Sequence, residues 1–114
     1  MTREIVGTTF EEHVEGIGSF TFARRTMRAE FRINAEYARL TEGVSPVPDQ
    51  LHVSADAVAT LKILTVKAPD GWNIDDLDPL ETDSYVKILT VWRALRARED
   101  AFRKSNKSGV KAEG

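Results

Sequence analysis

The stretch that decides the fold is residues 19–40, SFTFARRTMRAEFRINAEYARL, because the spacing of its apolar residues changes once along it. Phe20 and Phe22 alternate with polar neighbours, which is the two-residue period of a β-strand. After Thr26 the apolar residues recur at intervals of three and four, which is the period of an α-helix. The sequence therefore predicts that a strand gives way to a helix near Thr26.

A partner for this strand lies just before it in the sequence. The segments TTFEEHV and SFTFARR flank a short stretch that contains Gly16 and Gly18. Glycine adopts the backbone conformations that tight turns between antiparallel strands require. We therefore predict a β-hairpin over residues 8–24.

The first predicted helix starts after Thr26, a residue type that caps helix N-termini. Gly43 suits its C-terminus, and two prolines shortly afterwards prevent continuation, which leaves a helix of about four turns. A helical wheel gives it two apolar stripes and one polar side: Met27, Phe31, Ala35 and Ala38; Ile33, Tyr37 and Leu40; and Arg28, Arg32, Glu36 and Arg39. One stripe can face the core and the other a neighbouring protein surface.

The next segment, residues 51–69, reads LHVSADAVATLKILTVKAP and fits a second helix. Ser54 is a candidate N-cap, and Pro69 with Asp70-Gly71 would end the helix. The part LKILTV is rich in β-branched residues and also fits a strand, but the apolar segment is longer than a typical buried strand. We predict a helix with apolar residues almost all round it, which makes it the most buried helix or one held between protein surfaces.

The third predicted helix begins behind a capping sequence in which Asp78, Pro79 and Glu81 occupy the N-cap, first and third helical positions. Apolar residues then recur at helical spacing to about Lys104: Tyr85, Ile88, Leu89, Trp92, Leu95 and Phe102. Residues 1–104 are expected to form one mainly α domain with a minor β component, an N-terminal β-hairpin followed by three principal helices. Residues 105–114, SNKSGVKAEG, are expected to be a disordered polar tail.

Composition limits the possible classes of function. The 114 residues include 41% apolar and 30% charged residues and carry a net charge of -2, which fits one globular domain. Cysteine is absent, which excludes disulfides, thiolate nucleophiles and zinc sites built on sulfur, and fits a reducing cytoplasm. No apolar run approaches the roughly 18 residues of a membrane-spanning helix, so we expect no membrane partner.

The densest chemical feature is a group of six carboxylates within fourteen residues that contain no Lys or Arg: Asp70, Asp75, Asp76, Asp78, Glu81 and Asp83. Their spacing lacks the glycine and glutamate of a calcium-binding EF-hand loop. Helix capping and a solvated loop explain them, with weak cation or partner binding as the alternative. His13 and His52 lack a nearby Ser or Cys in a nucleophile–base arrangement. The sequence predicts no metal, no cofactor and no enzyme activity.

The basic residues include a cluster of five arginines just before and along the first predicted helix: Arg24, Arg25, Arg28, Arg32 and Arg39. They are the best case for nucleic-acid binding, but Glu30 and Glu36 interrupt them and the whole domain is mildly acidic. We favour a basic face that complements the acidic segment, within one chain or between neighbours in an oligomer. The candidate electrostatic contacts are Arg24, Arg25, Arg28, Arg32, Asp75, Asp76 and Asp78.

Three segments in this order give the chain a resemblance to the tail assembly chaperones of long-tailed bacteriophages and prophages: SFTFARRTMRAEFRINAEYARL, ATLKILTVKAPDGWNIDDLDP and YVKILTVWRALRAREDAFR. The resemblance covers roughly residues 8–104. It implies a non-enzymatic, mostly helical protein of the host bacterial cytoplasm that binds the tape measure protein and keeps it soluble. It also implies assistance to tail tube assembly, absence from the mature virion and, for this chain, self-association.

Candidate contact residues follow from the helical wheel, because the predicted helices carry more apolar surface than so small a domain can bury. They are Phe31, Ile33, Tyr37, Leu40, Trp72 and Trp92, with core packing as the alternative for both tryptophans. Two rival functions stay open. One is a small nucleic-acid-binding regulator that uses the arginine face, and the other is a structural tail or head-completion protein.

Overall fold

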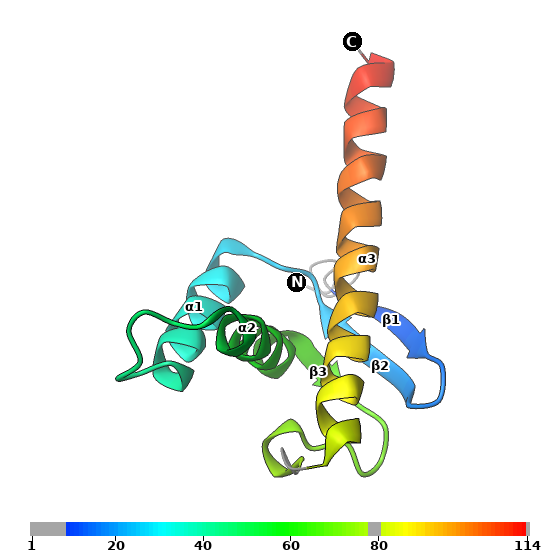
Figure 1. Cartoon of the computed structure of the whole chain (residues 1–114). Helices are drawn as coiled ribbons and strands as arrows, with labels where there is room; N and C mark the ends of the chain where they lie inside the picture. Colours follow the sequence, from blue (N-terminus) through cyan, green and yellow to red (C-terminus); the bar gives the residue numbers. More distant parts are fainter. Residues whose placement is uncertain (1–8, 78–80, 114) are drawn as a thin grey trace.

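The order of the secondary-structure elements follows the hairpin-then-helices pattern expected from the sequence. The computed structural model describes residues 9–77 and 81–113, and the side chains of 9–77, 81 and 83–104. The elements are β1 (Thr9–Val14), β2 (Gly18–Ala23), α1 (Met27–Leu40), α2 (Asp49–Leu64), β3 (Thr65–Lys67), the short 3-10 helix η2 (Ile74–Asp76) and α3 (Thr82–Glu113) (Figure 1). The predicted class, mainly α with a minor β component, is confirmed.

The sheet has three antiparallel strands in the order β1-β2-β3. Phe10 pairs with Phe22 across the hairpin, and Thr65 of β3 pairs with Phe22 on its other side. The stretch LKILTV therefore divides between the two structures that it fits, since Leu61–Leu64 end α2 and Thr65–Lys67 form β3. The open edge of β2 pairs with Thr65 and Lys67, and the β-branched Thr65 and Val66 favour a strand, which explains the change of structure at this point.

The hairpin turn packs closely against the segment that follows β3. Gly18 has a φ of +140°, and a Cβ atom placed there would lie 2.8 Å from Cβ of Pro69. Only glycine allows both this backbone conformation and this approach. The Pro69-Asp70-Gly71 turn is thereby held against the hairpin, and it positions Trp72.

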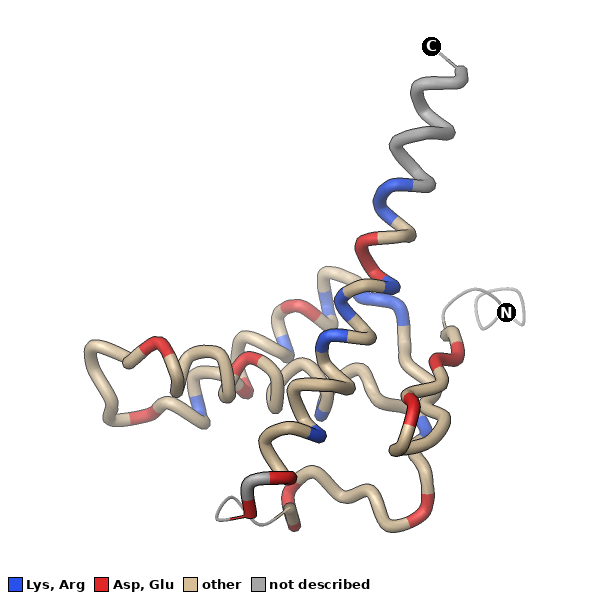
Figure 2. The backbone as a smooth tube through the Cα atoms, turned by 45° about the vertical axis from the view of Figure 1, so that its right-hand side comes forward, with Lys and Arg blue, Asp and Glu red and all other residues tan. Residues whose placement is uncertain are grey.

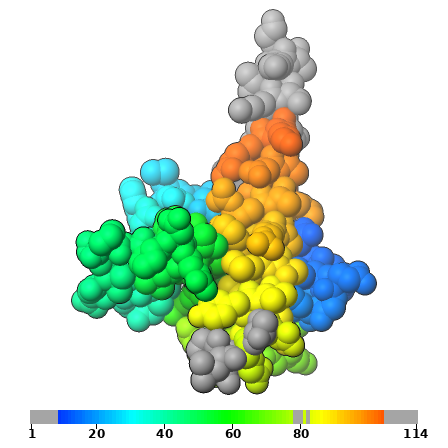
Figure 3. All heavy atoms as spheres, viewed as in Figure 1, coloured from blue at the N-terminus to red at the C-terminus, as the bar shows by residue number. Residues whose placement is uncertain are grey.

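The core joins the phenylalanines of the sheet to α2 and α3. Its fully buried members include Phe20, Phe22, Leu61, Leu64, Val91 and Leu95. Figure 3 shows α3 as a ridge between the α1–α2 pair on one side and the hairpin on the other. Among the described residues, α2 has six buried residues, α1 has only Ile33, and α3 has five: Ser84, Ile88, Val91, Leu95 and Glu99. The second helix is therefore the most buried helix, which is the first of the two predicted alternatives.

The start of α1 was predicted correctly and the start of α2 was not. The Thr26 side chain accepts a hydrogen bond from the Ala29 N–H at 3.1 Å, which makes Thr26 the N-cap. The helix α2 begins at Asp49, directly after Pro48, so Ser54 lies inside the helix and does not cap it. Asp49 explains the earlier start, because a carboxylate in the first turn interacts favourably with the helix dipole.

The boundaries of α3 also differ from the expected ones. The predicted cap residues Asp78 and Pro79 lie outside the described residues, and Glu81 precedes the helix, where its carbonyl accepts from the Ser84 N–H at 3.1 Å. The helical backbone continues to Glu113, past the expected end near Lys104 (Figure 1). No proline interrupts this stretch, which contains helix-forming Lys, Ala and Glu. The side chains beyond Lys104 lie outside the described part, and the expected disorder of residues 105–114 stays a prediction.

Candidate functional site

The two apolar stripes of α1 have different surroundings. Met27 is 69% exposed and Phe31 is 64% exposed, whereas Ile33 is 2% exposed and packs in the core. Tyr37 and Leu40 are half-buried against that core. The burial removes Ile33 from the predicted contact residues and leaves Met27 and Phe31 as the outward stripe of the helix.

Tyr37 is fixed by a histidine from the next helix. Its hydroxyl lies 2.7 Å from Nδ1 of His52, and the two rings meet edge to face with centroids 5.4 Å apart. This contact joins α1 to the first turns of α2. Tyr37 therefore has a structural partner within the chain, and Phe31 is the more available of the two aromatic residues.

Both tryptophans are half-buried against the core. Trp72 meets Phe20 edge to face, with ring centroids 5.2 Å apart. Trp92 packs against the core, and its buried indole Nε1 has no hydrogen-bond partner among the described residues. For both tryptophans, the larger part of the side chain therefore packs in the core, as the alternative prediction stated.

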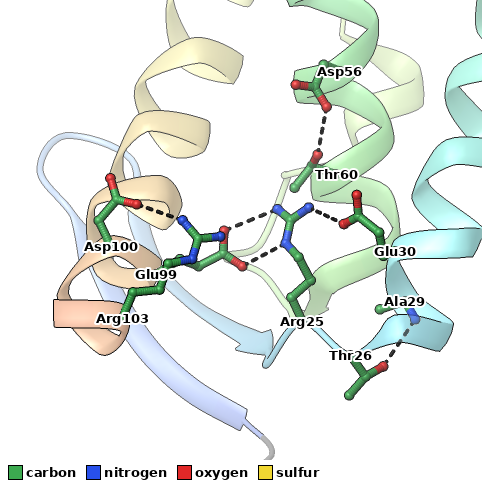
Figure 4. Close-up of polar contacts among 9 residues, drawn as sticks. All are labelled: Arg25, Thr26, Ala29, Glu30, Asp56, Thr60, Glu99, Asp100 and Arg103. Atoms are coloured by element: carbon green, nitrogen blue, oxygen red, sulfur yellow. Dashed lines mark hydrogen bonds and ion pairs between the residues drawn. The ribbon is translucent and has the colours of Figure 1, made fainter. Parts of the chain in front are cut away.

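Arg25, a predicted surface contact, instead holds three elements together (Figure 4). Its Nε and Nη2 atoms donate to the two carboxylate oxygens of Glu99 on α3, both at 3.1 Å. Its Nη1 donates to Glu30 on α1 at 2.8 Å. Burial opposes the charged form of Arg25, but the hydrogen bonds with Glu99 and Glu30 outweigh it and raise its pKa above the ordinary value.

The sequence analysis missed Glu99, although a signal for it was present. Ile88, Val91, Leu95 and Glu99 recur at spacings of three and four, so Glu99 stands where the buried stripe of α3 requires an apolar residue. A carboxylate at such a position needs a cation close by. Arg25 supplies it from a position 74 residues away in the sequence.

The acidic segment contacts α1 through Lys62, a residue that the sequence analysis had not singled out. Lys62 Nζ lies 3.2 Å from Asp75 and 3.1 Å from Glu36, and Glu36 also accepts from Nε of Arg39 at 3.1 Å. Lys62 of α2 therefore bridges the acidic segment and a carboxylate of α1, and among the described residues no ion pair joins one of the predicted arginines to Asp75 or Asp76. The expected match between the basic face and the acidic segment stays a prediction. Asp76 accepts from the Asn73 side chain at 2.9 Å, and Asp78 lies outside the described residues.

The Glu36 network gives a prediction for acid stability. Hydrogen bonds from Arg39, with a smaller contribution from Lys62 and with burial opposing them, lower the pKa of Glu36 to about 2 from its ordinary value of 4.5. The stabilisation is therefore complete above about pH 4.5 and is lost as the pH falls toward about 2, since the unfolded chain binds the proton first. We expect the free energy of unfolding to fall by about 1–2 kcal/mol over this pH range, once screening of the ion pairs by solvent is taken into account.

Urea denaturation between pH 7 and pH 2.5 measures this effect. Glu36→Gln should remove that part of the pH dependence. Glu42→Gln, a change at an exposed carboxylate in the turn after α1, should leave it intact. An unchanged pH profile in Glu36→Gln would show that the network contributes nothing to acid stability.

The other arginines surround a groove, which we call the arginine groove. Its rim carries Arg24, Arg28 and Arg32, and its floor is formed by Ala29, Ile63 and Leu64, with a volume of about 260 Å³. In Figure 2, basic residues colour the connection between β2 and α1, and acidic residues colour the loop that precedes α3. The tertiary structure therefore brings the end of α2 beneath arginines that the sequence placed on one face of α1.

Among the described residues, one contact resembles part of a catalytic arrangement, the pair of His13 and Ser19. His13 Nδ1 lies 3.1 Å from Ser19 Oγ, but both are exposed residues paired across the hairpin, and no third group that would orient the histidine bonds to it there. The described residues contain no group of three metal-ligating side chains. In the same ranges, no helix combines the length and the apolar content needed to cross a bilayer.

Comparison of the chain with protein-family models, with curated proteins and with solved structures gave no match.

Proposed function

We propose that this protein is a phage tail assembly chaperone that binds the tape measure protein, keeps it soluble and assists assembly of the tail tube, without catalysis. The observation that carries the proposal is the outward stripe of α1. Met27 and Phe31 expose about two thirds of their surface one helical turn apart. Large apolar side chains grouped on a small domain are typical of surfaces that bind other proteins.

Further exposed apolar residues support the same class of function. Val66 of β3 is 61% exposed, Val86 of α3 is 56% exposed and Tyr85 beside it is 42% exposed. A long, partly apolar client can contact several such places at once, so weak individual contacts add up. We propose the tape measure protein as the main partner, tail tube protein as a second partner and further copies of this chain as a third.

The proposed place of action is the cytoplasm of the host bacterium, and the chain is proposed to be absent from the mature virion. Shielding of apolar segments by stoichiometric binding needs neither nucleotide nor metal. A structural tail or head-completion protein would instead remain in purified virions, so detection of this chain there by mass spectrometry would favour that rival.

Co-expression with the large tape measure protein that the proposal expects to be encoded nearby tests the proposal. We expect the large protein to be soluble only in the presence of this chain and the two to co-purify. An equal yield of soluble tape measure protein with and without this chain would contradict the proposal.

Phe31→Ala is expected to weaken binding to the tape measure protein about tenfold, because it removes the largest exposed apolar side chain of the stripe. The folded state should be unaffected, since Phe31 contributes little to the core. Affinity is measured by calorimetry or by pull-down titration from the co-expressed complex. Val53→Ala, a change at an exposed apolar residue of α2 that the proposal does not use, is the matched control. An equal loss in both variants would remove the special role of the α1 stripe.

The arginine groove is the observation that favours the second candidate function, a nucleic-acid-binding regulator. Phosphate contacts from several arginines would give binding that weakens steeply as salt is raised. Titration of labelled duplex and single-stranded oligonucleotides at low salt tests this candidate. We expect no binding beyond the level given by an unrelated protein of the same net charge.

A further inference from the structure

We infer that the arginine groove is a binding site for an acidic amphipathic segment of a protein partner. The inference deepens the proposed function and rests on it only for the identity of the partner, because the groove itself specifies the chemistry of what it holds. The segment would carry carboxylates that reach Arg24, Arg28 and Arg32, and apolar side chains that cover the floor.

The charge of the groove is not balanced within the described part of the chain. Arg28 and Arg32 are exposed, lie one turn apart on α1 and have no ion-pair partner there, and Arg24 stacks over the Phe102 ring at 4.2 Å without a carboxylate. The arginines outside the groove that do have carboxylate partners are Arg25, Arg39, Arg98 and Arg103. None of the described residues that line the groove is acidic. The guanidinium groups of Arg28 and Arg32 are therefore available to a partner's carboxylates, which they can bind in a bidentate manner. One face of the Arg24 guanidinium is covered by Phe102, and its charge adds to theirs.

The floor of the groove distinguishes a protein segment from a nucleic acid. Ile63 and Leu64 lie beneath the arginines, and Met27 and Phe31 directly precede Arg28 and Arg32 in the helix. Basic and apolar side chains thus run along α1 in adjacent rows. An amphipathic peptide uses both rows at once, whereas a phosphate backbone uses only the basic one. The net charge of -2 also gives the domain no general attraction for a polyanion.

The position of the groove adds a reason for strong pairing. The N-terminus of α1 opens onto it, since Thr26, Arg28 and Ala29 all line it. The positive end of the helix dipole and the three guanidinium groups therefore act on the same carboxylates.

The test uses the full chain and a fluorescently labelled helical peptide of about four turns, with a row of glutamates beside a row of leucines. A matched peptide has glutamine in place of each glutamate. Fluorescence anisotropy should show binding of the glutamate peptide that weakens as salt is raised, and binding of the glutamine peptide that is about tenfold weaker or more. Equal binding of the two peptides, or no binding of either, would overturn the inference.

Variants of the chain locate the site. Arg32→Glu should weaken binding of the glutamate peptide about tenfold or more, because it replaces a cation by a like charge. Arg93→Glu makes the same change of charge at an exposed position of α3 and should have little effect. Both variants should keep the circular dichroism spectrum of the parent chain, as the two side chains are exposed. Equal losses in the two variants would place the binding outside the groove.

Two further outcomes separate the rival explanations. An oligonucleotide that binds more tightly than the glutamate peptide, and loses binding in Arg32→Glu, would assign the groove to nucleic acid and overturn the inference. The co-expression assay reports on the proposed function independently, since it does not use the peptide. Tape measure protein that stays soluble with Arg32→Glu, together with failed peptide binding, would remove only the groove inference. Peptide binding without any effect on tape measure solubility would remove only the proposed function.

Discussion

Phe22→Ala is expected to lower the free energy of unfolding by about 3–5 kcal/mol, the largest effect that we expect from a single substitution in this chain. Phe22 is fully buried in the middle strand of the sheet. Its ring stacks on that of Phe20 with centroids 5.6 Å apart and tilts toward that of Phe10 at 5.8 Å. Truncation would leave a cavity between rigid neighbours that cannot close over it.

The loss would spread along a row of aromatic residues. Trp72, Phe20, Phe22, Phe10 and Phe102 contact one another in that order and join the loop after β3, the hairpin and α3. A domain of this size has a total stability of about 5–15 kcal/mol, so the variant is expected to be partly unfolded at 37 °C.

Urea denaturation with an unchanged m-value measures the effect. Phe31→Ala is the matched control, because the same atoms are removed from a side chain that is 64% exposed. It should cost less than about 0.5 kcal/mol. A similar cost at both positions would show that Phe22 does not occupy the rigid core described here.

Arg25→Met is expected to lower the free energy of unfolding by about 2–4 kcal/mol. Methionine keeps much of the length and the apolar stem but leaves the buried Glu99 carboxylate without its bidentate partner. The cost comes mainly from the unpaired charge left behind and less from the attraction lost, since Glu99 is only 6% exposed.

A double-mutant cycle separates these contributions. The variant Arg25→Met with Glu99→Leu should recover most of the stability, because two apolar residues of similar size replace the buried pair. Arg103→Met is the matched control, since its ion pair with Asp100 has both side chains more than half exposed and should contribute less than about 1 kcal/mol. Additive losses in the cycle would show that Arg25 and Glu99 do not act as a pair.

The sequence predicted those features that depend on neighbours along the chain. The change of apolar period after Phe22 located the hairpin and α1. Thr26 marked the boundary, because its hydroxyl accepts a hydrogen bond from an N–H only three residues further along the chain. The same reasoning failed at Ser54, because an equally good start for α2 lay five residues earlier at Asp49. Several residues of one stretch can satisfy a local rule, and only packing selects among them.

The candidate site was predicted in part. Helical periodicity placed Phe31 and Ile33 on different stripes of α1, yet it gave no way to tell which stripe would meet α2 and the sheet. The burial of Ile33 and the exposure of Phe31 decided this. The same limit applied to the arginines, of which Arg25 turns inward to Glu99 while Arg28 and Arg32 line the groove.

The sequence by itself determined the class of fold, the hairpin, the presence of three helices and the alternation that buries Phe20 and Phe22, because these follow from backbone sterics and from periodicities of two and 3.6 residues. Tertiary structure alone decided the division of LKILTV between α2 and β3, the pairing of Lys62 with Asp75 and Glu36, and the choice of outward stripe on α1. Each of these depends on a partner farther away in the sequence, such as the open edge of β2 for Thr65 or the Glu36 carboxylate of α1 for Lys62. The free energy of such a contact depends on which groups the folded chain brings within a few ångströms, and local sequence does not contain that information.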